Sequence, residues 1–130
     1  MASFIIVSHS KKIAEGVKEL VGEMNPGQAM IKAVGGTEDG RIGTNSFAIK
    51  QAIEEVSNDA NIFVLMDLGS SIMATQMAMD LLDKSIEEKV ILIDAPIVEG
   101  AIAAIIQASI TSNVEEIVHA AREAKTMNKF

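Results

Sequence analysis

Short apolar runs alternate with segments of helical periodicity along the chain. The runs cover residues 3–8, 29–34, 62–66 and 90–93, and each has the length and composition of a buried strand. Strands that alternate with helices are typical of a parallel sheet whose crossover helices lie on its faces. The pattern therefore predicts an α/β fold, with an open, mostly parallel sheet of four core strands and helices on both faces.

Helices are predicted between these strands. The first ends at Asn25-Pro26-Gly27, the second spans about 44–56, and the third follows Ser71. The first helix places Ile13, Val17, Leu20, Val21 and Met24 on one face, the second buries Phe47, Ala48, Ala52, Ile53 and Val56, and the third is marked by Ile72, Met73, Met77, Leu81 and Leu82.

The C-terminal third of the chain adds two more predicted helices. Residues 98–110 are apolar nearly all round, which suits burial against the sheet or at a subunit interface. A short fifth strand near residues 107–111 is the alternative for the end of this segment. Ser112 and Glu115 have capping-box spacing, so a last helix is expected from 113 to about 124.

Composition limits the domain organisation and the location. The chain has 130 residues, of which 48% are hydrophobic, so we expect one domain that spans residues 1–130. No apolar stretch is long enough to cross a bilayer, and residues 4–7 are too short for a signal-peptide core. We therefore expect a cytoplasmic protein without membrane insertion.

The charge of the chain and the absence of several motifs limit the classes of ligand that we expect it to bind. The chain has no cysteine and a net charge of -7, which excludes disulfides and thiolate metal sites and argues against a nucleic-acid partner. The glycines between 35 and 43 match neither the dinucleotide-binding nor the P-loop motif, and the two distant histidines lack zinc-site spacing. We expect no bound cofactor and no metal.

His9 is the best candidate for chemistry, because it follows the first predicted strand and few other side chains offer a nucleophile near neutral pH. In open parallel sheets, ligands bind at the carboxyl ends of strands, where the order of connections reverses. Gly35-Gly36-Thr37 and Asp67-Leu68-Gly69-Ser70 also follow strand ends. If the strand order is 2-1-3-4, the first and third strands are neighbours, and His9 lies close to Asp67.

Such a pair has a known chemistry. A carboxylate that accepts a hydrogen bond from one ring nitrogen orients the imidazole and makes the opposite nitrogen a better nucleophile. Backbone N–H groups near Gly69 and Ser70, at the start of the third helix, can hold a phosphoryl group on that nitrogen. From the residues alone, however, His9 can be a hydrogen-bonded boundary residue, and Asp67 can begin a turn or cap a helix.

Three other polar residues have simpler explanations. Ser8 and Ser10 flank the histidine in extended chain, where adjacent side chains point to opposite faces, so hydrogen bonding is expected rather than a Ser-His nucleophile pair. His119 lies among glutamates in the last predicted helix, and a solvated helix face explains it.

Five segments carry a resemblance to a known family: Ile6-Val7-Ser8-His9-Ser10, Gly35-Gly36-Thr37, Ile42-Gly43-Thr44, Met66-Asp67-Leu68-Gly69-Ser70 and Ala95-Pro96-Ile97-Val98-Glu99-Gly100. Together they resemble the phosphohistidine-carrying IIA domains of the mannose type, which belong to the bacterial phosphoenolpyruvate-dependent phosphotransferase system. More closely, they look like the phosphotransferase subunits of phosphoenolpyruvate-dependent dihydroxyacetone kinases. Sugar-transporter members usually have Gly-Thr-His-Gly around the histidine and Asp-x-x-Gly-Gly-Ser-Pro after the third strand, and this chain has neither.

The resemblance implies that His9 accepts a phosphoryl group from the carrier protein HPr, with phosphoenolpyruvate as the ultimate donor, and passes it to ADP on the nucleotide-binding subunit of dihydroxyacetone kinase. Asp67 would orient His9. It also implies a homodimer, which fits the apolar helix near Ala101. The residues expected to bind or support the phosphoryl group are Ser10, Thr37, Gly69 and Ser70.

Two other functions stay open at this point. The chain can be the IIA component of a mannose-family sugar transporter, which passes its phosphoryl group to a IIB protein. It can also be a regulatory or binding module on the same fold.

Overall fold

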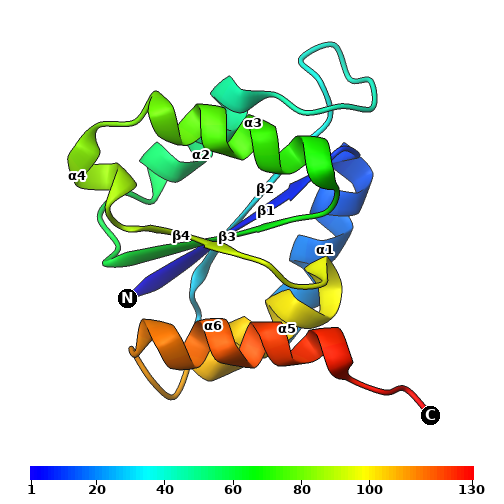
Figure 1. Cartoon of the computed structure of the whole chain (residues 1–130), viewed down its shortest axis with the longest axis vertical. Coiled ribbons are helices and arrows are strands. Elements are labelled where there is room, and N and C mark those ends of the chain that lie inside the picture. The colour runs from blue at the N-terminus through cyan, green and yellow to red at the C-terminus, as the bar shows by residue number, and fades with distance from the viewer.

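A parallel four-stranded sheet runs through the middle of the protein (Figure 1). The computed structural model describes residues 1–130. The order β2-β1-β3-β4, with every neighbouring pair parallel, confirms the predicted α/β fold and strand order. The strands are β1 (Ala2–Ser8), β2 (Met30–Gly35), β3 (Asn61–Met66) and β4 (Val90–Ile93).

Helices cover both faces of this sheet, as predicted (Figure 1). One face packs against α1, α5 and α6, and the other packs against α2 and α3. Because both faces are covered, the strands are apolar along nearly their whole length. The helices are α1 (Lys11–Glu23), α2 (Ser46–Glu55), α3 (Gly69–Asp80), α4 (Lys84–Glu87), α5 (Ile97–Ala108) and α6 (Val114–Glu123), followed by the 3₁₀ turn η1 (Ala124–Thr126).

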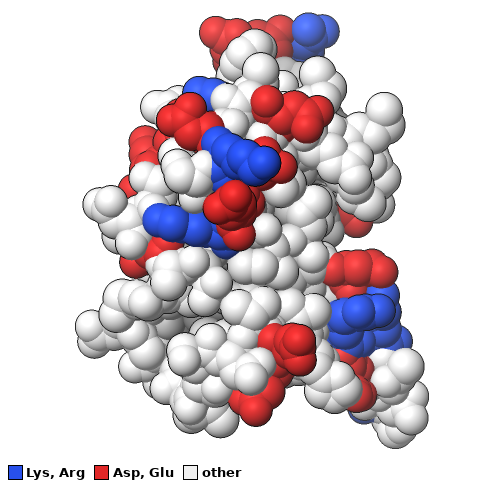
Figure 2. All heavy atoms as spheres, turned by 60° about the vertical axis from the view of Figure 1, so that its left-hand side comes forward, with Lys and Arg blue, Asp and Glu red and all other residues white.

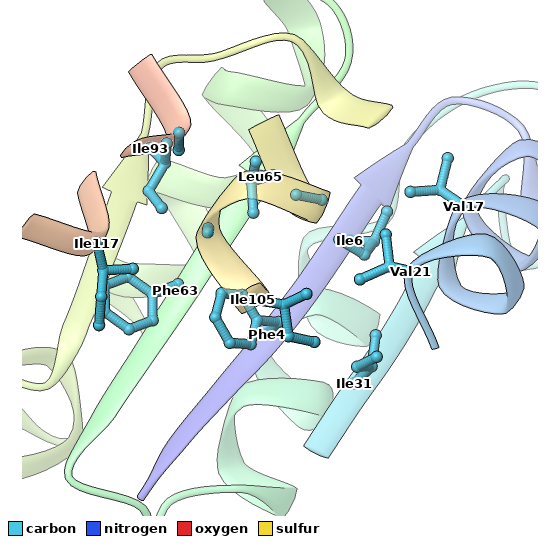
Figure 3. Close-up of a cluster of buried hydrophobic side chains, with 13 residues drawn as sticks. Phe4, Ile6, Val17, Val21, Ile31, Phe63, Leu65, Ile93, Ile105 and Ile117 are labelled. Atoms are coloured by element: carbon cyan, nitrogen blue, oxygen red, sulfur yellow. The ribbon is translucent and has the colours of Figure 1, made fainter. Parts of the chain in front are cut away.

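Alternating side chains of β1 enter two separate cores. Phe4 and Ile6 belong to the core beneath α1, α5 and α6, whereas Ile5 and Val7 belong to the core beneath α2 and α3. Phe4 stacks on Phe63 of β3 with ring centroids 5.3 Å apart, and Figure 3 shows both rings among the aliphatic side chains of the first core. These contacts fix β1 against β3, the two strands whose ends carry His9 and Asp67.

The predicted inner faces of α1 and α2 are only partly right. Val17 and Val21 of α1 are buried, but Ile13, Leu20 and Met24 are about half exposed, at 52%, 48% and 45%. The burial predicted for Phe47 is wrong, since its side chain is 70% exposed. Phe47 precedes Ile49 by two positions, which places the two residues on opposite sides of the helix. Ile49, Ala52 and Ile53 are the buried residues of α2.

The face of the third helix that packs on the sheet is not the one that carries its large apolar side chains. The residues of α3 that face the sheet are small ones, Ala74, Thr75 and Ala78, which let the helix pack close to the strands. Met73 and Met77 therefore lie on the outer face, 66% and 58% exposed. An apolar outer face remains on this helix.

The C-terminal helices correct two expectations. The alternative of a fifth strand near 107–111 is wrong, because α5 continues to Ala108 and the sheet ends at β4. The last helix begins as predicted, but its cap is Asn113 rather than Ser112, since Asn113 Oδ1 accepts the Glu116 N–H at 3.1 Å. Ala101 is fully buried between the sheet and α6, whereas Ile106 of the same helix is 38% exposed, so α5 is covered over much but not all of its apolar surface.

Charged side chains of both signs are interspersed on the face drawn in Figure 2. Several ion pairs form on the surface of the protein, including Lys50 with Glu54 at 2.9 Å and Lys125 with Asp94 at 2.6 Å. None of the helices combines the length and the apolar character needed to cross a membrane.

Candidate active site

His9 and Asp67 meet at the carboxyl edge of the sheet because their strands are parallel neighbours. In the pairing of β1 with β3, Val7 is opposite Met66. Strand β3 ends at Met66, and β1 ends one residue after Val7, at Ser8. The Asp67 N–H donates to the Val7 carbonyl at 3.2 Å, which extends the ladder past β3. His9 Nδ1 lies 3.0 Å from Asp67 Oδ1. The structure therefore brings the predicted pair into direct contact.

The Asp67 carboxylate accepts four hydrogen bonds. Oδ1 accepts hydrogen bonds from Nδ1 of His9 and from the Leu68 N–H, at 3.0 and 2.7 Å. Oδ2 accepts hydrogen bonds from the Ser8 hydroxyl and from the His9 N–H, at 2.7 and 3.0 Å. Both oxygens are thus held in fixed directions, and one of them points at the imidazole.

These bonds also set the charge of Asp67. Burial is the largest single influence and by itself raises the pKa, but the hydrogen bonds from Ser8, His9 and Leu68 together lower the pKa of Asp67 from 3.8 to about 2. The group is therefore ionised at neutral pH, and an ionised carboxylate only accepts hydrogen bonds. It follows that Nδ1 of His9 carries the ring proton in the neutral imidazole and that Nε2 keeps a free electron pair.

Nε2 faces the first turn of α3, where in this tautomer it accepts a hydrogen bond from the Ser70 hydroxyl. The first N–H groups of a helix have no acceptor within the helix, and they attract anions. Elsewhere Ser10, Asn45 and Asn113 cap α1, α2 and α6 with their side chains. The α3 N-terminus has neither a side-chain cap nor an acidic residue in its first turn. Ser70 thus lies beside Nε2 of His9, and Gly69 precedes it as the first residue of α3, whereas phosphoryl binding by either residue remains a prediction.

Two other predicted site residues occupy structural positions. Ser10 is the N-cap of α1, and its hydroxyl oxygen accepts the Ile13 N–H at 3.2 Å. The Thr37 hydroxyl contacts the Asp39 carboxylate and accepts the Arg41 N–H at 3.0 Å, so its hydrogen bonds stay within its own loop. A direct phosphoryl contact of either side chain remains a prediction.

The loop that contains Thr37 is nonetheless joined to the site. The Gly43 N–H donates to the His9 carbonyl at 2.8 Å. At the start of the loop, a Cβ on Gly35 would lie 2.5 Å from the Ser10 carbonyl oxygen, so only glycine permits this close approach. The two glycines hold the loop against the backbone of His9 and Ser10.

The simpler explanations given for Ser8 and His119, hydrogen bonding and a solvated helix face, are confirmed. The Ser8 hydroxyl makes hydrogen bonds, as expected, but its contact with Asp67 was not foreseen. The register offers the only signal for that contact, since Ser8 follows the residue of β1 that pairs with Met66. His119 is 74% exposed and lies 3.0 Å from Glu123 on the surface of α6.

His9 is sheltered but reachable. Its side chain is 19% exposed, and that of Asp67 is 14% exposed. No cluster of three or more histidine, cysteine, aspartate or glutamate side chains is placed to hold a metal ion. The arrangement can therefore direct one imidazole nitrogen, with its electron pair free, at an electrophile held near a helix N-terminus.

The open parallel sheet and the carboxylate-held histidine at its switch point agree with the class of protein to which the chain is similar, the IIA components of the phosphotransferase system. The chain belongs to the EIIA-man family, whose model, described as "PTS system fructose IIA component", matches residues 3–118.

The names of curated relatives point to a narrower group of proteins than the family model does. Over 118 residues the chain is 42% identical to "PEP-dependent dihydroxyacetone kinase 2, phosphoryl donor subunit DhaM" of Listeria innocua, which covers 91% of this chain and 94% of the relative. It is 41% identical over 127 residues to the phosphoryl donor subunit DhaM of Providencia stuartii, but spans only 27% of that longer protein. A crystallised protein of unknown function has the same fold, with a TM-score of 0.86 and 35% identity over 94% of this chain and 93% of its own.

Proposed function

We propose that this protein is a phosphohistidine carrier that accepts a phosphoryl group on Nε2 of His9 and passes it to ADP on the nucleotide-binding subunit of dihydroxyacetone kinase. The observation that carries the proposal is the hydrogen bond between His9 Nδ1 and the ionised Asp67. This bond leaves Nε2 as the free nucleophile.

Each of the two transfer steps forms one bond to phosphorus and breaks another. In the loading step, the electron pair of Nε2 attacks the phosphorus of a phosphohistidine donor, and the donor N–P bond breaks with its electron pair returning to the donor ring. The proton on Nδ1 stays between His9 and Asp67, and the carboxylate stabilises the positive charge of the phosphorylated ring. In the unloading step, a terminal phosphate oxygen of ADP attacks the phosphorus, and Nε2 recovers its electron pair.

The first turn of α3 is the proposed seat of the phosphoryl oxygens. Ser70 is exposed, so its hydroxyl can turn away from Nε2 when the phosphoryl group arrives and then donate to it. The backbone N–H groups of Gly69 and Ser70 supply further donors at the positive end of the helix dipole.

Exposed apolar side chains beside His9 support a protein partner. Ile42 is 73% exposed and precedes Gly43, whose N–H binds the His9 carbonyl. Leu68 is 64% exposed and follows Asp67. Apolar side chains that rim a polar centre are typical of protein-protein contacts. We propose that HPr docks here as the donor, in the cytoplasm, with phosphoenolpyruvate as the ultimate source of phosphate.

The homodimer expected from the resemblance needs an exposed apolar surface, and α5 offers little of it, because Ile106 is its one large apolar side chain among the exposed ones, at 38%. The outer face of α3, where Met73 and Met77 are exposed, is the proposed alternative.

The names of the curated relatives favour dihydroxyacetone kinase as the acceptor. The description of the family model favours a second candidate, in which a sugar-transporter IIB protein is the acceptor. A competition experiment separates them. The protein is loaded from phosphoenolpyruvate with enzyme I and HPr, freed of both, and divided between a kinase mixture and a IIB protein. The kinase mixture contains the other two kinase subunits, ADP and dihydroxyacetone. We expect the kinase mixture to remove the phosphoryl group from the protein within seconds. Removal by the IIB protein alone would contradict the proposal.

A further inference from the structure

Two buried serines of β1 each hold an aspartate. Ser3 and Ser8 are both 0% exposed, and their hydroxyls donate to Asp59 and Asp67 respectively. Ser3 lies at the amino end of the strand, whereas Ser8 lies at the carboxyl end, where its aspartate contacts His9. The same local arrangement thus occurs once away from the candidate site and once within it.

Ser8 is fixed from both sides. Its oxygen accepts the Ser10 N–H at 3.1 Å, and its hydroxyl donates to Asp67 Oδ2 at 2.7 Å. The acceptor bond leaves the hydroxyl proton free to point at the carboxylate. Ser10 in turn caps α1, so Ser8 is joined to the start of that helix as well.

The orientation of Asp67 depends on Oδ2 being held. A carboxylate rotates about its bond to Cβ unless both oxygens have partners. The Ser8 hydroxyl and the His9 N–H hold Oδ2, and the Leu68 N–H holds Oδ1 near the imidazole. Of these three donors, only the Ser8 hydroxyl belongs to a side chain and can be removed by substitution.

Charged neighbours do not replace this bond. On α1, Lys11 and Lys12 are exposed, and α3 has no ionisable side chain before Asp80. In the loop after β2, Arg41 pairs with Asp39 at 2.9 Å. After β4, Asp94 lines a small hollow with Asp67 but pairs with Lys125. Apart from His9 itself, neutral donors hold the Asp67 carboxylate.

We infer that Ser8 is a positioning residue that aims Asp67 at Nδ1 of His9 and thereby fixes which ring nitrogen is free. The meaning of this role for phosphoryl transfer rests on the proposed function, but its effect on the Asp67-His9 pair does not. Ser8 acts through Asp67 and does not touch the reacting nitrogen.

The test uses the unphosphorylated protein first. Ser8→Ala is compared with Ser8→Thr, which keeps the hydroxyl, and with Ser3→Ala, which removes an equally buried hydroxyl from the same strand. Carbon-13 NMR follows the Asp67 carboxyl through an acid titration, and nitrogen-15 NMR reports the His9 tautomer at neutral pH. We expect Ser8→Ala to move the Asp67 midpoint from about 2 toward 3.8 and to mix the His9 tautomers. Ser8→Thr and Ser3→Ala should leave both unchanged.

The second part measures phosphoryl transfer from phosphorylated HPr to the same variants. Loss of one hydrogen bond to a charged group predicts a rate roughly tenfold lower for Ser8→Ala and recovery in Ser8→Thr. An unchanged midpoint and tautomer in Ser8→Ala, or equal changes in Ser3→Ala, would overturn the inference. If Ser8→Ala shifts the NMR signals while the wild-type protein accepts no phosphate, the positioning role stands and the proposed function fails.

Discussion

His9 Nδ1 lies 3.0 Å from Asp67 Oδ1, although the two residues are 58 positions apart in the chain. The contact exists because β1 and β3 are parallel neighbours that end at the same level of the sheet. Both strands are anchored by apolar side chains in two cores, so the pair is placed by the most rigid part of the fold. This relationship is the source of the predictions below.

Replacing Asp67 by asparagine should slow phosphoryl transfer without unfolding the protein. The neutral amide cannot stabilise the positive charge on a phosphorylated ring, and its NH₂ group can present a donor to Nδ1 and favour the wrong tautomer. A loss of roughly 10²-fold or more in the transfer rate from phosphorylated HPr is expected. Rapid-quench measurement of the labelled protein gives this rate.

Asp94→Asn is the matched control, because Asp94 follows β4, lies at the same edge of the sheet and is 86% exposed. Its rate should stay within about twofold of the wild-type rate, as is usual for exposed residues outside a site. Equal rates for Asp67→Asn and Asp94→Asn would contradict the role given to Asp67.

Acid should remove a defined part of the folding stability. The pKa of Asp67 is lower in the folded protein, about 2 against 3.8, so its contribution is present above pH 3.8 and is lost as the pH falls toward 2. The contribution amounts to about 2 kcal/mol. Urea unfolding at pH 5, 3 and 2 should show the free-energy gap between wild type and Asp67→Asn shrinking by this amount. A gap that stays constant across these pH values would show that the carboxylate is not held in the way described.

Gly69→Pro tests the helix N-terminus as the phosphoryl seat. Gly69 is the first residue of α3, where proline is tolerated, and Leu68 already has the extended backbone that precedes proline, with φ -125 and ψ 169. The substitution removes one N–H and should slow transfer roughly 10-fold to 100-fold. Gly69→Ala keeps the N–H, and its Cβ meets no atom within 4 Å, so it should transfer at nearly the wild-type rate. Circular dichroism confirms that both variants are folded, and equal rates for the two would count against this seat.

The strands themselves were predictable from local patterns, and the His9-Asp67 pair followed from a general rule of parallel sheets once the order 2-1-3-4 was assumed. Each buried strand is a short apolar run, and ligand sites lie where the direction of the connections reverses. The position of Ser70 beside the reactive nitrogen follows from the same rule, since it starts the helix after the Asp67 strand.

Other features depend on tertiary packing and escaped prediction. The buried face of α3 consists of Ala74, Thr75 and Ala78, so the large side chains Met73 and Met77 point outward against the usual pattern. The bond from Ser8 to Asp67 depends on the exact register of β1 against β3, which no local pattern encodes. Thr37 differs for another reason, since its loop folds back on itself and satisfies the hydroxyl internally.

Phosphorus-nitrogen coupling in NMR spectra of the phosphorylated protein tests the central claim most directly. The protein is labelled with nitrogen-15 in its two histidines and loaded from phosphoenolpyruvate through enzyme I and HPr. We predict one phosphohistidine, with coupling to Nε2 of His9, that is lost in His9→Gln and retained in His119→Gln. Coupling to Nδ1 of His9, a phosphate on His119, or labelling that survives in His9→Gln would contradict the account.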